Sequence, residues 1–177
     1  MKLAKTLSLA VLLATSSMSF AAAAAPAPAP AQVLTVGHVR AVTSLMAAMQ
    51  VEKMMKTIAH TSRYASDAQR ASVLAKLAAV PPAEIHARLG FPVARFISAE
   101  TATEMARFYA TPNGQMVVHR MYNSTGGLQG LGAAKPTAAE SKDMQRPAFI
   151  KANREVQEAD AKIRHEAFVL MQAISKR

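Results

Sequence analysis

Apolar side chains recur every three or four residues along most of the chain, and this spacing limits the fold more than any other feature. Between residues 37 and 60 the apolar stripe consists of Val39, Val42, Leu45, Met46, Met49, Met55 and Ile58. The spacing matches the turn of an α-helix that buries one face. The closest approach to a strand pattern, residues 32–36, is short. The sequence therefore predicts an all-α fold, a single-domain bundle of about five or six helices.

Capping residues, prolines and glycines predict where these helices begin and end. We expect helices at residues 37–60, 67–79, 82–89, 99–110, 112–123 and 147–175. Ser66, Ser98 and Thr111 have the side chains and positions of N-caps. Gly90 is expected to end the short helix before it, in the left-handed conformation that glycine tolerates. Pro147 either begins the last helix or marks a kink between two helices.

The last helix is expected to bury a seam of large side chains with alanines between them. The seam consists of Phe149, Val156, Ile163, Leu170 and Ile174, with Ala152, Ala159 and Ala167 between them. On its outer face, Asp160 and Arg164 have the favourable i, i+4 order for an ion pair. Upstream, Thr137 and Glu140 have the spacing of a capping box. The region after residue 136 is therefore predicted to be helical.

The first 25 residues have the order of a bacterial secretory signal. Two lysines, Lys2 and Lys5, precede a mostly apolar run over residues 7–13, which is followed by serines and an alanine-rich stretch. A bilayer span needs roughly 20 apolar residues, so we do not expect this run to remain as an anchor. We expect the signal to be cleaved after Ala21, Ala23 or Ala25. The sequence thus predicts a periplasmic or exported protein with no transmembrane segment in the mature chain.

The rest of the chain divides into a spacer and one helical domain. Residues 26–36 are rich in alanine and proline, and residues 37–177 form the predicted domain, with a glycine-rich connector at 124–136. Removal of residues 1–25 leaves 152 of the 177 residues, which is enough for one core. The chain contains no cysteine, which excludes disulfides, thiolate metal sites and a cysteine nucleophile.

Positive charge is in excess but is not concentrated in one block. Removal of Lys2 and Lys5 lowers the formal net charge from +10 to +8. Between residues 53 and 135, ten Lys or Arg residues stand against four acids. This composition is typical of a solvated basic surface, or of one that attracts anionic lipids, acidic glycans or an acidic partner protein. Nucleic acid is not an expected partner, because we expect the chain to be exported and because its Lys and Arg residues are not interleaved with aromatic residues.

The most distinctive local pattern lies between residues 98 and 116. Its core consists of Phe108, Tyr109, Thr111, Pro112, Gly114 and Gln115. The pattern predicts a helix, a tight break and a second helix, with Phe108 and Tyr109 filling the corner. Gly114 is expected to allow the second helix to approach its neighbour closely. We therefore expect these residues to be structural.

This segment resembles a bacterial exported family catalogued as domain of unknown function 2059. The family has a recurring Phe-Tyr-x-Ser-Pro-x-Gly-(Gln or Lys) motif, and here Thr111 stands where serine is usual. The chain also lacks an acid at Thr101 and carries a glycine-rich insert after Ser124. The resemblance covers about residues 96–121. It implies a helical exported protein, and it brings no catalytic residues with it.

Local motifs for catalysis, cofactors or metal are missing from the sequence. The glycines at 127, 130 and 132 reverse the order of a dinucleotide fingerprint and follow no strand, so they indicate a linker. No two of the five histidines lie four residues apart on a helix; they are His38, His60, His86, His119 and His165. We therefore expect no cofactor, no metal and no enzymatic activity, unless a site is assembled from distant segments.

Three hypotheses for the function remain. The first is a non-catalytic periplasmic helical protein that binds another envelope component through an apolar groove or its basic surface. Eleven methionines, four of them within residues 46–55, are core filler or the lining of such a groove. The second is an envelope enzyme that combines residues such as Glu104, His119 and His165. The third is peripheral binding to an anionic membrane.

Overall fold

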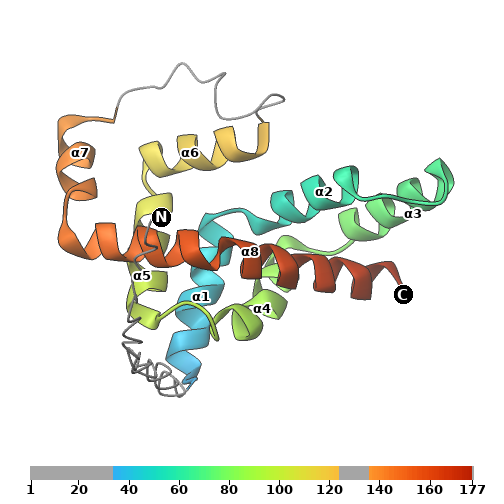
Figure 1. Ribbon diagram of the computed structural model, residues 1–177, viewed down its shortest axis with the longest axis horizontal. Coiled ribbons are helices and arrows are strands. Elements are labelled where there is room, and N and C mark those ends of the chain that lie inside the picture. The colour runs from blue at the N-terminus through green and yellow to red at the C-terminus, as the bar shows by residue number, and fades with distance from the viewer. Residues whose placement is uncertain (1–33, 124–135, 177) are drawn as a thin grey trace, which may run out of the picture. The chain divides into compact units, whose positions relative to one another are not determined.

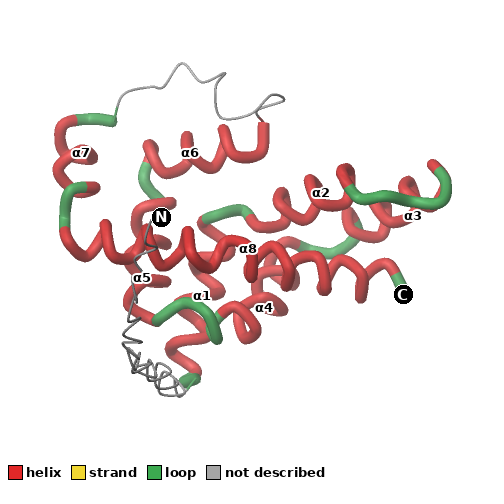
Figure 2. Tube along the Cα trace, in the orientation of Figure 1, coloured by secondary structure: helices red, strands yellow, loops and turns green. Residues whose placement is uncertain are grey.

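The computed structural model describes residues 34–123 and 136–176, and these residues form eight helices and no strand (Figure 1, Figure 2). The helices are α1 Val36–Ala48, α2 Val51–Thr61, α3 Asp67–Ala78, α4 Pro82–Val93, α5 Ala99–Tyr109, α6 Pro112–Asn123, α7 Ala138–Met144 and α8 Pro147–Ser175. All of them belong to one compact unit, residues 32–177, so the predicted all-α single-domain fold is confirmed. The predicted signal peptide, most of the spacer and most of the 124–136 connector lie outside the described residues.

The predicted count of five or six helices is wrong, first because the expected 37–60 helix is broken. Gln50 lies between α1 and α2 with φ 52° and ψ 50°, the left-handed conformation. That conformation costs a non-glycine residue roughly 1–2 kcal/mol, so it persists only where tertiary contacts hold it. Here the Gln50 Nε2 donates to Gln115 Oε1 at 2.6 Å. The apolar spacing could not reveal a break that depends on a partner 65 residues away.

The second additional helix is α7, which is separate from α8. The predicted capping box is confirmed: Thr137 Oγ1 accepts from the Glu140 N–H, and Glu140 Oε2 accepts from the Thr137 N–H. This short helix ends at Met144, and Pro147 is the first residue of α8, so the choice left open for Pro147 is settled as a helix start. Together with the break at Gln50, α7 raises the count of described helices to eight.

Gly90 does not end a helix as predicted, because α4 continues through it to Val93. A Cβ atom at Gly90 would lie 2.3 Å from Thr43 Oγ1 on α1. The glycine is therefore required by the close packing of α4 on α1, and a helix-ending conformation is not involved.

At the N-terminal end of the unit, Thr35 Oγ1 accepts from the His38 N–H at 3.1 Å. This cap begins α1 at Val36, one residue inside the expected 26–36 spacer.

The remaining boundaries agree closely with the predictions. Ser66 and Ser98 cap α3 and α5 through hydrogen bonds of 3.2 and 3.3 Å from backbone N–H groups. In α6, however, the buried side differs from the predicted side of Met116, Val117, Arg120 and Met121. Val118 is fully buried, whereas Met121 is 39% exposed. The buried face of α6 therefore includes Val118, which lies beside the face that the bulky residues predict.

The core is organised around α8, which packs against α2, α3, α4, α5 and α7 (Figure 1). The predicted seam of α8 is buried except for Leu170, which is half-buried beside the buried Met171. The methionines of α1 and α2 are at most 3% exposed: Met46, Met49, Met54 and Met55. They are core residues and do not line a surface groove. In the part of the chain described here, no helix combines the length and apolar content needed to cross a bilayer.

Candidate functional site

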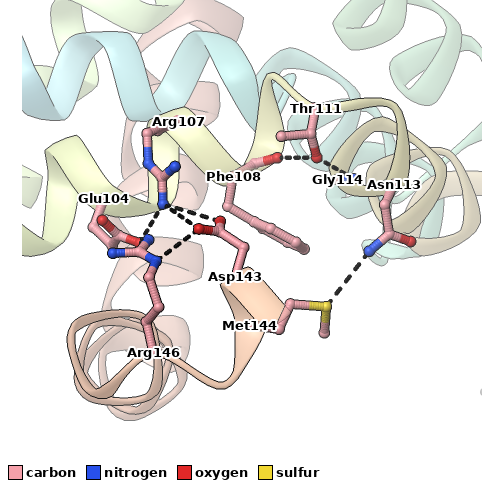
Figure 3. A network of polar contacts seen from close by, with 9 residues as sticks. All are labelled: Glu104, Arg107, Phe108, Thr111, Asn113, Gly114, Asp143, Met144 and Arg146. Atoms are coloured by element: carbon pink, nitrogen blue, oxygen red, sulfur yellow. Dashed lines mark hydrogen bonds and ion pairs between the residues drawn. The ribbon is translucent and has the colours of Figure 1, made fainter. Parts of the chain in front are cut away.

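The family-like motif forms the corner between α5 and α6. Thr111 Oγ1 donates to the Phe108 carbonyl at 2.7 Å and accepts from the Gly114 N–H at 3.0 Å (Figure 3). A Cβ atom at Gly114 would lie 2.1 Å from the Phe108 carbonyl oxygen, so only glycine fits. Pro112 is the first residue of α6. The corner therefore has the local structure that the spacing predicts.

Gln115 connects this corner to the break between α1 and α2. Its Nε2 donates to the Tyr109 carbonyl at 2.5 Å and to the Ala48 carbonyl at 3.2 Å, and its Oε1 accepts from Gln50. One side chain thus satisfies carbonyl groups at two helix ends, where the helices leave them without partners. The sequence identified Gln115 as part of the motif but not these partners.

The aromatic residues of the motif fill the joint between α5 and α8. The Phe108 ring centroid lies 5.2 Å from that of Tyr109 and 4.9 Å from that of Phe149, both edge-on. Burial of the Tyr109 phenol raises its pKa, and the nearby Asp160 carboxylate raises it further. Tyr109 is therefore a neutral core residue. The contacts of the motif residues connect α5 with α6, with α8 and with the end of α1, which is what a structural role requires.

Beside the corner, two acids and two arginines form an ion-pair network (Figure 3). The Arg107 Nη2 lies 3.0 Å from Glu104 Oε1 and 3.0 Å from Asp143 Oδ2. Arg146 pairs with the same two acids, its Nε lying 2.6 Å from Asp143 Oδ1. The network joins α5 to α7 and to the turn before α8, and its formal charges cancel.

Helix α7 is held by polar contacts, since none of its residues is buried. Besides the Asp143 ion pairs, Glu140 Oε1 accepts from the Asn113 N–H at 3.0 Å. The Asn113 amide also approaches Met144 Sδ at 3.6 Å (Figure 3). Hydrogen bonds from the Thr137 backbone, the Thr137 hydroxyl and the Asn113 backbone lower the pKa of Glu140.

The residues suggested for an assembled enzyme site lie on three helices. Glu104 on α5 pairs with Arg107 of the same helix and with Arg146 of the turn before α8, so its carboxylate belongs to the ion-pair network. His119 on α6 and His165 on α8 are both exposed. Within residues 34–123 and 136–176, no three His, Asp or Glu side chains are placed to hold a metal ion together.

Two other histidines make contacts that the sequence did not predict. His86 Nε2 lies 2.8 Å from Glu52 Oε2, and this half-buried pair joins α4 to α2. His38 is buried, with its Nε2 2.6 Å from the Ile97 carbonyl. Each histidine finds its partner on a distant segment, so no local spacing could have revealed the contact.

The exposed side of α2 carries basic side chains, and the acid beside them, Glu52, lines the same small hollow as Lys56. Lys53, Lys56 and His60 share one helix face by their spacing of three and four residues, and Arg63 follows directly after the helix end. We name these four residues the α2 basic face. All four are exposed, and residues 53–66 contain no acid. The nearest acid before them, Glu52, is bound to His86.

An apolar hollow of about 460 Å³ lies between the start of α1 and the end of α4. Its lining includes Val36 and Phe91, which are 78% and 59% exposed. None of the methionines that the sequence suggested for an apolar groove lines this hollow.

Comparison with known proteins finds no match to the chain among protein-family models, curated proteins or solved structures. The resemblance of residues 96–121 to the exported family stays a prediction.

Proposed function

We propose that this chain is a non-catalytic protein of the bacterial envelope, exported by its N-terminal segment, that binds an anionic lipid surface through the α2 basic face. The observation that carries the proposal is the acid-free run of residues 53–66, whose basic side chains are exposed along α2 and just after its end. The same proposal includes membership of the exported family that residues 96–121 resemble, because the resemblance implies an exported helical protein.

Electrostatics favours an extended anionic surface as the partner. Each Lys or Arg near such a surface contributes about 1 kcal/mol, so Lys53, Lys56 and Arg63 together contribute about 3 kcal/mol. That free energy corresponds to roughly a hundredfold in affinity. Binding of this kind is strongly weakened by salt, because salt shortens the Debye length, beyond which exposed charges are screened.

The test is co-sedimentation of the purified protein with vesicles, either of phosphatidylcholine alone or containing phosphatidylglycerol. We expect binding only to the anionic vesicles, and loss of that binding at high salt. Pull-down from envelope extracts under the same two salt conditions tests the broader idea of an envelope partner. Binding that ignores lipid charge would contradict the proposal.

A matched pair of triple variants separates a defined surface from net charge alone. The first removes three charges from the α2 basic face: Lys53→Gln, Lys56→Gln and Arg63→Gln. The second removes three exposed charges from α7 and α8, where acids lie nearby in the sequence: Lys142→Gln, Lys151→Gln and Arg154→Gln. We expect a roughly hundredfold loss of vesicle affinity only for the first. Equal losses for the two would show that the location of the charges is irrelevant.

A further inference from the structure

A polar cavity lies at the Arg63 end of the α2 basic face. Its volume is about 230 Å³, and its walls come from the segment after α2, from α3 and from the last turns of α8. The residues that line the cavity include Ser62, Arg63, Gln69, Phe168, Gln172 and Ser175. The volume is below the usual range for drug-sized ligands, about 300–1,000 Å³, so the cavity fits one small group.

The nitrogen donors in this cavity favour an anionic ligand. The Gln69 side-chain oxygen accepts from the Ala65 N–H at 2.9 Å, and its amide nitrogen has no hydrogen-bond partner among the described residues. Gln172 supplies a second, exposed amide and Arg63 a guanidinium. Nitrogen donors and a guanidinium bind phosphate or carboxylate oxygens well.

Two further basic side chains contact residues that line the cavity, and one of them, Arg70, is paired with an acid. The Arg70 guanidinium lies 5.9 Å from the ring centroid of Tyr64, which also lines the cavity. The Lys76 Nζ donates to the Ser175 carbonyl at 2.8 Å. Asp67 pairs with Arg70 at 3.3 Å, which leaves Arg63 and Lys76 as the cations beside the cavity. These cations favour a phosphate monoester, which carries more negative charge at neutral pH than a carboxylate.

The remaining walls suit a hydroxylated carbon chain. The Ser62 hydroxyl donates to the Ile58 carbonyl at 2.7 Å, and the Ser175 hydroxyl donates to the Gln172 carbonyl at 2.8 Å. Their oxygens can therefore accept hydrogen bonds from ligand hydroxyls. Phe168, 38% exposed, adds an apolar surface for the carbon atoms of such a ligand.

From these features we infer that the cavity binds the phosphate ester of a small polyol, such as glycerol phosphate. The glycerol phosphate unit occurs in free phosphate monoesters and also, as a diester with one negative charge, in the headgroup of phosphatidylglycerol. The lipid source rests on the proposed function, because the α2 basic face would bring the cavity to the anionic surface. The cavity itself is a separate site, formed by residues that the basic face, apart from Arg63, does not contain.

The test is calorimetric titration of the purified protein with glycerol 1-phosphate, with glycerol as the neutral control. We expect saturable binding of the phosphate ester only. Gln172→Trp places a bulky ring at an exposed position of the cavity and should abolish that binding. Gln172→Glu, a smaller change, should weaken it by roughly tenfold through charge repulsion. The matched control is Gln157→Trp, at an exposed glutamine about 22 Å earlier on the same helix, which should leave binding unchanged.

The outcomes separate this inference from the proposed function. Lys53→Gln with Lys56→Gln should weaken vesicle binding and leave glycerol 1-phosphate binding intact. If Gln172→Trp also weakens binding to phosphatidylglycerol vesicles, the ligand is the lipid headgroup; if it affects only the free ester, the ligand is soluble. No binding of the free ester, or equal binding by wild type and Gln172→Trp, would overturn the inference even if vesicle binding persists.

Discussion

The α5–α7 region and α2 use their basic side chains in opposite ways. Arg107 and Arg146 pair with Glu104 and Asp143, so the charges of that region cancel within the protein (Figure 3). The α2 basic face lies on a segment without acids. We infer from this difference that net charge alone would not identify a binding surface. What matters is which bases are already engaged by acids of the same chain.

If this distinction is right, changes around α5, α6 and α8 should alter stability, and changes on α2 should alter binding. The largest loss of stability is expected for Gly114→Ala. A Cβ atom there would lie 2.1 Å from the Phe108 carbonyl oxygen and 2.6 Å from the Tyr109 Cα, both backbone atoms. We expect the free energy of unfolding to fall by about 3 kcal/mol, measured by urea unfolding.

The matched control for this variant is Gly37→Ala. A Cβ atom at Gly37 would meet Thr35 Oγ1 at an ordinary contact distance of 3.8 Å. Alanine is favoured over glycine in a helix by up to about 1 kcal/mol, so this variant should be neutral or slightly more stable. Equal losses for Gly114→Ala and Gly37→Ala would refute the role given to the corner.

A somewhat smaller loss is expected for Glu155→Ala. The Glu155 carboxylate on α8 accepts from the Ser98 N–H at 2.5 Å, the Ser98 hydroxyl at 3.1 Å and the Thr101 hydroxyl at 2.6 Å. These groups lie at the N-terminal end of α5, where a negative charge is favoured. Their loss should lower the free energy of unfolding by about 2 kcal/mol. The exposed Glu158→Ala, on the same helix, should change it by less than about 0.5 kcal/mol.

The ion-pair network should contribute less, because its side chains are partly exposed. Asp143→Asn removes the acid shared by Arg107 and Arg146, whose side chains are 51% and 38% exposed. Solvent screens such pairs, so we expect a loss of about 1 kcal/mol or less, and a smaller one in high salt. A loss that does not change with salt would show that packing of α7, and not charge, is what the substitution disturbs.

The smallest effect is the pH dependence contributed by Glu140. Its pKa is lower in the folded protein than in the unfolded chain, so the unfolded chain binds more protons in the acidic range. The stabilisation is present above the unfolded pKa and is lost as the pH falls through the folded pKa. The stability difference between wild type and Glu140→Gln should therefore shrink on acidification. A stability difference between wild type and Glu140→Gln that grows at low pH would contradict a lowered pKa of Glu140 in the folded protein.

Local sequence predicted those parts of the fold that depend on neighbouring residues. The caps Ser98 and Thr111 and the close approach at Gly114 all act within a few positions. The break at Gln50 was missed because its partner, Gln115, lies 65 residues away. Gly90 was misassigned because a glycine near a helix end has the same local pattern as one required by packing.

The candidate site was only partly predictable. Composition indicated a basic protein, but the location of basic side chains outside ion pairs depends on which acids are already bound by other residues. Glu52 is the clearest case, since it is bound by His86 from another helix, 34 residues away. The polar cavity likewise joins Arg63 and Gln172, which are far apart in the sequence. Its walls could not be identified from spacing within one helix.

The most direct test of the central claim uses the absence of cysteine from the chain. Thr57→Cys places a single labelling site among the α2 basic residues, and Gln157→Cys places one on an exposed part of α8. Each variant is labelled with an environment-sensitive fluorophore and titrated with phosphatidylglycerol vesicles. We expect a spectral shift from the label at position 57 and none from the label at 157. A shift at 157 alone, or equal shifts at both positions, would contradict binding through the α2 basic face.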